Sequence, residues 1–136
     1  MRVVLDTNIL FSALISPHGG PGQIYRAWRA DRFEVVTSRV QLDEIRNASR
    51  YPKFRSVLQP AKVGSLINNL RRSVVLETLP SEIEATDPHD SFLLGMALAG
   101  SADYLVTGDR RAGLLERKNI ARTRILTPTR FCSEVL

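Results

Sequence analysis

The chain has 136 residues, with 19 Lys and Arg against 14 Asp and Glu, so its formal net charge is +5 with neutral histidines. This length predicts one domain over residues 1–136, and its ordinary apolar fraction of 43% excludes a disordered, collagen-like or coiled-coil chain. A single cysteine, Cys132, excludes an internal disulfide framework, and no apolar run approaches the roughly 20 residues that cross a bilayer. We therefore expect a cytoplasmic protein without a membrane partner. The pI near 10.0 weakly favours a polyanionic partner.

The first half of the chain alternates short apolar strands with helices. Residues 3–5 form the first expected strand, and the loop at 17–22, rich in Gly and Pro, leads into a helix. A second strand is expected at 33–37. Ser38 then caps a helix, and Gln41, three residues later, completes a capping box.

The second half continues the same pattern. An amphipathic helix is indicated by apolar residues at helical spacing, namely Val63, Leu66, Ile67 and Leu70. Asp87-Pro88 and Thr127-Pro128 are typical helix starts. Three more strands are expected at 73–77, 104–107 and 123–126. Because the strands lack period-two alternation, both of their faces should be buried, which predicts a three-layer α/β sandwich on a five-stranded parallel sheet.

Four acidic residues fall where such a sheet exposes its ligand-binding edge. Asp6 directly follows the first strand and Asp109 lies just past the fourth. Glu44 lies two turns into the helix after the second strand, and Asp90 lies in the first turn of the helix before the fourth. Ligands of open α/β sheets bind beyond the carboxyl ends of the strands, so the four acids can converge on one cleft.

Converging carboxylates repel one another and favour a counter-cation. The natural choice is a hard divalent ion with oxygen ligands, Mg²⁺ or Mn²⁺. Such an ion polarises a phosphoryl oxygen and lowers the pKa of a bound water, as phosphodiester hydrolysis requires. The basic remainder of the surface would then hold the polyanion.

Each acid also has a purely structural interpretation. Asp6 and Asp109 could cap the helices that follow them, and Glu44 could lie on a solvated helix face. Asp90 could complement a helix dipole. Asp87 is more readily a helix cap than a ligand. These interpretations, taken together, leave the gathering of acids at one sheet edge unexplained.

The motifs at these positions resemble a known family. They are Val3-Val4-Leu5-Asp6-Thr7-Asn8, Leu42-Asp43-Glu44-Ile45, Asp87-Pro88-His89-Asp90 with Leu93-Leu94-Gly95-Met96-Ala97, and Tyr104-Leu105-Val106-Thr107-Gly108-Asp109. In this order and spacing they resemble a PIN domain, over essentially Met1 to Val135. More narrowly, the chain resembles PIN proteins grouped as toxins of bacterial and archaeal toxin–antitoxin pairs, the VapC-like ribonucleases. The segment Arg50-Tyr51-Pro52-Lys53-Phe54 also suits that group.

The resemblance implies a Rossmann-like sandwich and a ribonuclease that depends on Mg²⁺ or Mn²⁺. Carried over by motif, the catalytic and metal-binding acids are Asp6, Glu44, Asp90 and Asp109. Asn8 and Thr107 match small polar positions beside the metal, and Asp87 either assists a second metal or caps its helix. The implied partners are RNA, a cognate antitoxin protein and a second copy of the chain. The apolar residues from 63 to 70 could form that dimer seam or equally pack within the subunit.

Rival functions remain open at this point. A phosphoaspartyl phosphatase would need a second Asp two residues after Asp6, where the chain has Asn8, and a nucleotide-binding domain would need a Gly-rich turn there. A non-catalytic basic RNA-binding module and a housekeeping RNA-processing nuclease are the stronger alternatives. Candidate RNA contacts, each of which could equally be a solvated side chain, are Arg26, Arg29, Arg46, Arg110, Arg111 and Lys118.

Overall fold

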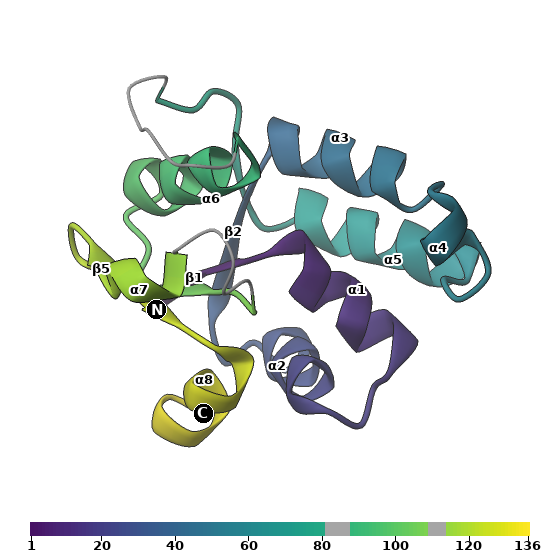
Figure 1. The fold of residues 1–136 in the computed structure, drawn as a ribbon, viewed down its shortest axis with the longest axis horizontal. Coiled ribbons are helices and arrows are strands. Elements are labelled where there is room, and N and C mark those ends of the chain that lie inside the picture. The colour runs from purple at the N-terminus through teal and green to yellow at the C-terminus, as the bar shows by residue number, and fades with distance from the viewer. Residues whose placement is uncertain (81–87, 109–113) are drawn as a thin grey trace.

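The computed structural model describes residues 1–80, 88–108 and 114–136. In this part of the chain one sheet has the strand order β3-β2-β1-β4-β6-β5 (Figure 1). The strands are β1 (Arg2–Leu5), β2 (Glu34–Ser38), β3 (Val74–Leu76), β4 (Tyr104–Val106), β5 (Asn119–Ile120) and β6 (Thr123–Leu126). All five predicted strands are present and pair in parallel, which confirms the expected α/β class with a parallel central sheet.

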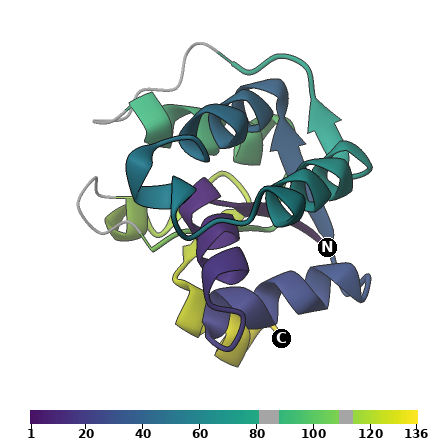
Figure 2. The ribbon, with the colours of Figure 1, turned by 90° about the vertical axis from the view of Figure 1, so that its right-hand side faces the viewer.

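Helices cover both faces of the sheet (Figure 2). They are α1 (Thr7–Ile15), α2 (Gly20–Arg29), α3 (Arg39–Ala48), α4 (Pro52–Arg55), α5 (Pro60–Arg71), α6 (Pro88–Ala99), α7 (Leu114–Arg117) and α8 (Pro128–Glu134). Side chains from α1, α2, α3, α5 and α8 share one apolar core, and those of α6 form a second core on the other face. No helix in the described ranges is long and apolar enough to span a membrane.

The strand residues alternate between the two cores. In β1, Val3 and Leu5 pack into the larger core, whereas Val4 packs with α6. In β4, Leu105 faces α6 and Val106 faces the larger core. Burial on both faces is the reason that these strands read as continuous apolar runs in the sequence.

A sixth strand, β5, was absent from the sequence prediction. It pairs with β6 in antiparallel fashion through Asn119 and Ile120 alone. Lys118 and Ala121 flank it with positive φ angles of 64° and 50°. A two-residue strand carries too little periodicity for a sequence pattern to reveal.

The predicted helix starts hold where they are described. The side chain of Ser38 accepts a hydrogen bond from the Gln41 N–H at 3.1 Å, and Thr127 caps α8 in the same way. α6 begins at Pro88, as expected for a first-position proline. In α5, Val63, Leu66 and Leu70 are buried in the chain's own core, so this stripe packs within the subunit.

The sheet register brings the carboxyl ends of three strands together. Leu5 at the end of β1 is paired with Val106 at the end of β4. On the other side of β1, Val4 is paired with Val36, two residues before the end of β2. The residues that follow β1 and β4, Asp6 and Thr107, therefore emerge side by side at one edge.

Candidate active site at the carboxyl edge of the sheet

Asp6 is a buried carboxylate that both ends β1 and begins α1. Its side chain is 1% exposed. Its backbone N–H donates to the Val106 carbonyl at 3.0 Å, which extends the pairing of β1 with β4. One carboxylate oxygen, Oδ1, accepts from the backbone N–H of Asn8 at 3.2 Å, so Asp6 caps α1. The capping interpretation is therefore correct, and it leaves the acid at the predicted edge.

Thr107 holds the other oxygen of the same carboxylate. Its hydroxyl, which is fully buried, donates to Asp6 Oδ2 at 2.8 Å. The Thr107 backbone N–H donates to the Leu126 carbonyl at 3.0 Å, and this bond anchors the residue to β6. Two neighbouring strand ends thus orient one carboxylate. Of the two small polar positions predicted to support the site, Thr107 contacts Asp6 through its side chain and Asn8 through its backbone N–H, and the Asn8 side chain is exposed.

Gln41 is a buried polar residue whose role the sequence prediction missed. Its side-chain amide donates to the Leu5 carbonyl at 2.7 Å, and its oxygen accepts from the Thr37 hydroxyl at 2.7 Å. It therefore ties α3 to the ends of β1 and β2. The predicted capping box is half right, because Ser38 caps Gln41 but the Gln41 side chain turns to β1. The available signal was a glutamine on the same helix face as Ile45 and Ala48, which are buried.

Glu44 and Asp90 lie on two of the helices that flank the sheet, α3 and α6. Glu44 is half-buried, one turn after Gln41 in α3. Asp90 lies in the first turn of α6, which packs on β1, β2 and β4. Because α6 leads directly into β4 and runs back along it, its first turn lies at the carboxyl edge.

Part of the predicted acid set falls outside the described residues. Asp87 and Asp109 belong to the two undescribed segments, and the side chain of Asp90 is likewise not described. Among the side chains that are described, no three acidic, His or Cys groups converge. Asp6 and Glu44 are therefore the two predicted acids whose side chains the structure describes. Their oxygen donors have the chemistry that Mg²⁺ and Mn²⁺ prefer.

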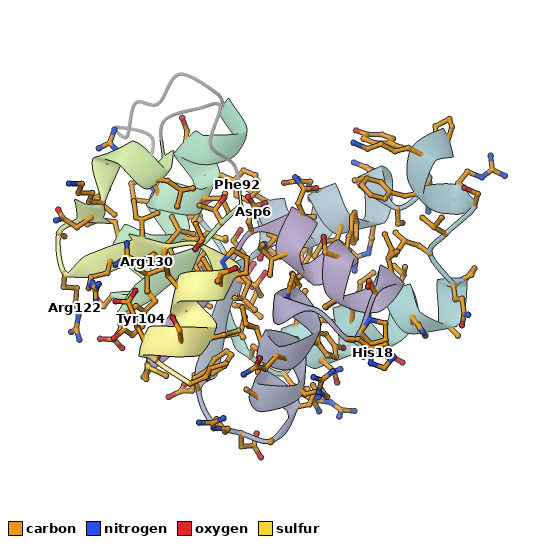
Figure 3. The ribbon with its side chains drawn as sticks, turned by 60° about the horizontal axis from the view of Figure 1, so that its bottom comes forward. Asp6, His18, Phe92, Tyr104, Arg122 and Arg130 are labelled. Atoms are coloured by element: carbon orange, nitrogen blue, oxygen red, sulfur yellow. The ribbon has the colours of Figure 1, made fainter. Side chains whose placement is uncertain are left out.

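His18 and several basic residues lie away from Asp6. Figure 3 shows His18 at the other side of the molecule, beyond the end of α1 that is opposite Asp6. Arg26 donates to the Pro17 carbonyl in the same loop, and Arg29 stacks on Trp28 with 5.4 Å between its guanidinium carbon and the ring centroid. Arg46 is paired with Asp43 at 3.4 Å. Of the three remaining candidate contacts, Lys118 is exposed next to β5, and Arg110 and Arg111 lie outside the described residues.

Asp103 occupies the opposite, amino-terminal edge of the sheet. It precedes β4 and accepts from the Arg2 backbone N–H at 2.8 Å and from the Arg122 guanidinium. The Arg2 N–H, and then Arg122, hold the pKa of the Asp103 carboxyl below its usual value of 3.8 despite partial burial. Asp103 is thus a structural acid that joins three segments of chain.

The fold and this edge define a three-layer α/β protein whose candidate site lies around a buried carboxylate at the carboxyl ends of parallel strands. The chain belongs to the PIN domain family, because the family model described as PIN domain matches residues 2–111. It is 29% identical over 114 residues to the uncharacterized protein MJ1680 of Methanocaldococcus jannaschii, which covers 81% of this chain and 72% of that protein.

A solved structure shares the fold. It is a chain from the crystal structure of VapBC2 from Rickettsia felis bound to a DNA fragment from their promoter. The TM-score is 0.57 at 19% sequence identity, with 93% of this chain and 98% of that chain covered. At this identity the match supports the fold.

Proposed function

We propose that this protein is an endoribonuclease that depends on Mg²⁺ or Mn²⁺, cleaves single-stranded or structured RNA, and acts as the toxin of a toxin–antitoxin pair. The observation that carries the proposal is the buried Asp6 carboxylate, held in one orientation by Thr107 and the Asn8 N–H at the sheet edge where the other motif acids are expected. Membership of the PIN domain family supports the same conclusion.

The proposed ion ligands are Asp6, Glu44, Asp90 and Asp109. When bound, the divalent ion supplies Lewis-acid polarisation of the scissile phosphate and lowers the pKa of a water molecule. The Asn8 N–H donates to one oxygen of the Asp6 carboxylate and the Thr107 hydroxyl to the other, which fixes the orientation of the carboxylate. Glu44 positions the attacking water or accepts its proton. In-line attack at phosphorus expels the 3′ oxygen and leaves a 5′ phosphate.

The proposed partners are RNA and an antitoxin protein. The structural neighbour comes from VapBC2 bound to promoter DNA, and the motifs of this chain resemble those of toxin–antitoxin PIN proteins. An antitoxin that covers the acidic edge or places a basic residue there would neutralise its charge and block the phosphate. Growth arrest on expression, relieved by a neighbouring gene, is the expected result for a toxin. A harmless active nuclease would instead indicate RNA processing.

The decisive experiment is cleavage of end-labelled single-stranded RNA with Mn²⁺, with Mg²⁺ and with EDTA. Asp6→Asn and Asp90→Asn are expected to abolish metal-dependent cleavage, since asparagine retains the capping ability of Asp6 but lacks its charge. The matched control is Asp31→Asn, because Asp31 is exposed, lies away from the edge, and has a φ of 59° that asparagine tolerates. Cleavage that persists in both site variants would exclude this site. RNA binding without any turnover would favour the binding-module alternative.

A further inference from the structure

A groove of about 620 Å³ lies between α3, α4 and α5, outside the acidic edge. Its rim carries three arginines, Arg46 and Arg50 from the α3 end and Arg55 from α4. Its floor is apolar, formed chiefly by Leu58, Val63 and Ile67. Gly64 also lines it, and a Cβ at this position would meet nothing within 4 Å, so the groove is open along α5.

The arginines of this groove are available to an anion. Arg50 and Arg55 are exposed, and neither forms an ion pair within the part of the chain that the structure describes. Arg46 is paired with Asp43, an exposed carboxylate one helical turn away. No acidic residue lines the groove among those described. Three guanidinium groups without lining carboxylates favour a ligand that carries several negative charges.

The neighbouring α4 segment alternates cations with aromatic rings. Phe54 stacks edge-on against Phe11 at 4.8 Å and is therefore committed to the core, while Lys53 lies 4.8 Å from the Phe54 ring centroid. Tyr51, by contrast, is 53% exposed beside Arg50. An exposed aromatic ring next to a basic groove is the combination by which proteins stack bases while they hold a nucleic-acid backbone.

Helix α3 connects this groove with the acidic edge. Glu44 and Arg46 are two residues apart, and at 3.6 residues per turn their side chains leave the helix on nearly opposite sides. One side of α3 therefore belongs to the candidate active site and the other to the groove. A helix is about 10–12 Å across, so the two lie within reach of one short strand.

We propose that the groove formed by α3, α4 and α5 binds single-stranded RNA next to the cleavage site, with Arg50 and Arg55 on phosphates and Tyr51 stacked on a base. The inference rests on the proposed function for its substrate class. It adds a binding surface, and three residues, that none of the site motifs contains. RNA is favoured over a polypeptide, because the groove offers guanidinium groups and the exposed Tyr51 ring follows Arg50 directly in the chain.

The test measures binding of a fluorescein-labelled single-stranded RNA by anisotropy in EDTA, over a series of salt concentrations, so that cleavage does not contribute. The groove variant is Arg50→Gln/Arg55→Gln. The matched control is Arg32→Gln/Arg72→Gln, which removes the same charge from two exposed arginines at the amino-terminal edge of the sheet. Thermal denaturation of both variants checks that each remains folded.

We expect the groove variant to lower the slope of log affinity against log salt by about 1.4, since each lost single-strand phosphate contact accounts for about 0.7. We expect Tyr51→Ala to weaken binding about fivefold or more. The control should leave the slope at its wild-type value. An equal loss in both double variants would overturn the proposal, because it would reflect net charge alone. If the groove variant kept its affinity for RNA but lost affinity for poly-glutamate, the proposal would be overturned and the groove would be assigned to an acidic protein segment instead.

Cleavage with Mn²⁺ separates this inference from the proposed function. If wild type binds RNA through the groove but does not cut it, the ribonuclease proposal fails and the groove assignment stands. If wild type cleaves RNA and the groove variant binds and cleaves RNA as the control variant does, the groove assignment fails and the ribonuclease proposal stands.

Discussion

The Thr107 hydroxyl donates a hydrogen bond to the Asp6 carboxylate, which is sealed from solvent. Thr107→Val removes this donor at nearly constant volume, so we expect the free energy of unfolding to fall by about 1.5–3 kcal/mol. If Asp6 binds the metal, cleavage should also fall about 10–100-fold, as when partners that orient a ligand are lost. Urea denaturation followed by the fluorescence of the single tryptophan, Trp28, and RNA cleavage measure the two effects.

Thr123→Val is the control for this prediction. The Thr123 hydroxyl is also buried and donates to the Ala102 carbonyl at 2.6 Å, on the amino-terminal side of β6. Thr123→Val should lower the free energy of unfolding and leave the rate of RNA cleavage unchanged. If both threonine variants reduced cleavage to the same extent, Thr107 would have only a structural role.

The Gln41 side chain donates to the Leu5 carbonyl and accepts from the Thr37 hydroxyl, near the ends of two neighbouring strands. Gln41→Leu would leave the Leu5 carbonyl without its side-chain donor and Thr37 without its acceptor, so we expect a loss of about 1–3 kcal/mol. The urea midpoint should fall with an unchanged slope. Gln23→Leu, on the exposed face of α2, should stay within about 0.5 kcal/mol of wild type. Equal urea midpoints for Gln41→Leu and Gln23→Leu would contradict a contribution of the Gln41 hydrogen bonds to stability.

At the scale of single elements, Asp103 connects the start of β4 with the start of β1 and with Arg122. Because its pKa is lowered in the folded protein, its contribution to stability is present above the unfolded value of about 3.8 and is lost as the pH falls through the lower folded value. Asp103→Asn should therefore destabilise the protein at neutral pH. The difference from wild type should shrink below pH 3.8. Urea titrations at neutral and acidic pH test this, and a difference that grew with acid would reverse the assignment.

The elements themselves were largely predictable from local patterns. The five parallel strands, the Ser38 and Thr127 caps and the start of α6 at Pro88 each follow from a few neighbouring residues. β5 was missed because its pairing with β6 depends on a tight turn with positive φ at Ala121 rather than on a run of apolar residues.

The candidate site was less accessible to local patterns. Asp6 was identified from its place after a strand, but its bond to Thr107 joins residues 101 positions apart, and only strand order brings them together. Gln41 looked like a cap residue because its sequence spacing fits that motif equally well. Its true partners lie in other elements, which no local window contains. Asp87 and Asp109 lie outside the described residues, so their places in the site stay predictions.

At the scale of the whole molecule, the proposed metal should act on stability as well as on chemistry. A ligand that binds only the folded state at about 100 times its dissociation constant adds about 2.7 kcal/mol, which corresponds to roughly 10 °C in Tm for a chain of this size. We expect Mn²⁺ to raise the Tm of wild type by this amount and to have no such effect on Asp90→Asn. Asp31→Asn should respond as wild type does. An equal Mn²⁺ shift in all three proteins would place the ion elsewhere.

The position of β1 in the middle of the sheet has a consequence during protein synthesis. β1 pairs on one side with β2 and on the other with β4, whose residues 104–106 are synthesised long after residues 2–5 of β1. A nascent chain therefore has Asp6 long before it has Thr107 to orient it. Whatever this edge does to the molecules around it, a nascent chain lacks the arrangement until β4 and Thr107 have been synthesised and have paired with β1.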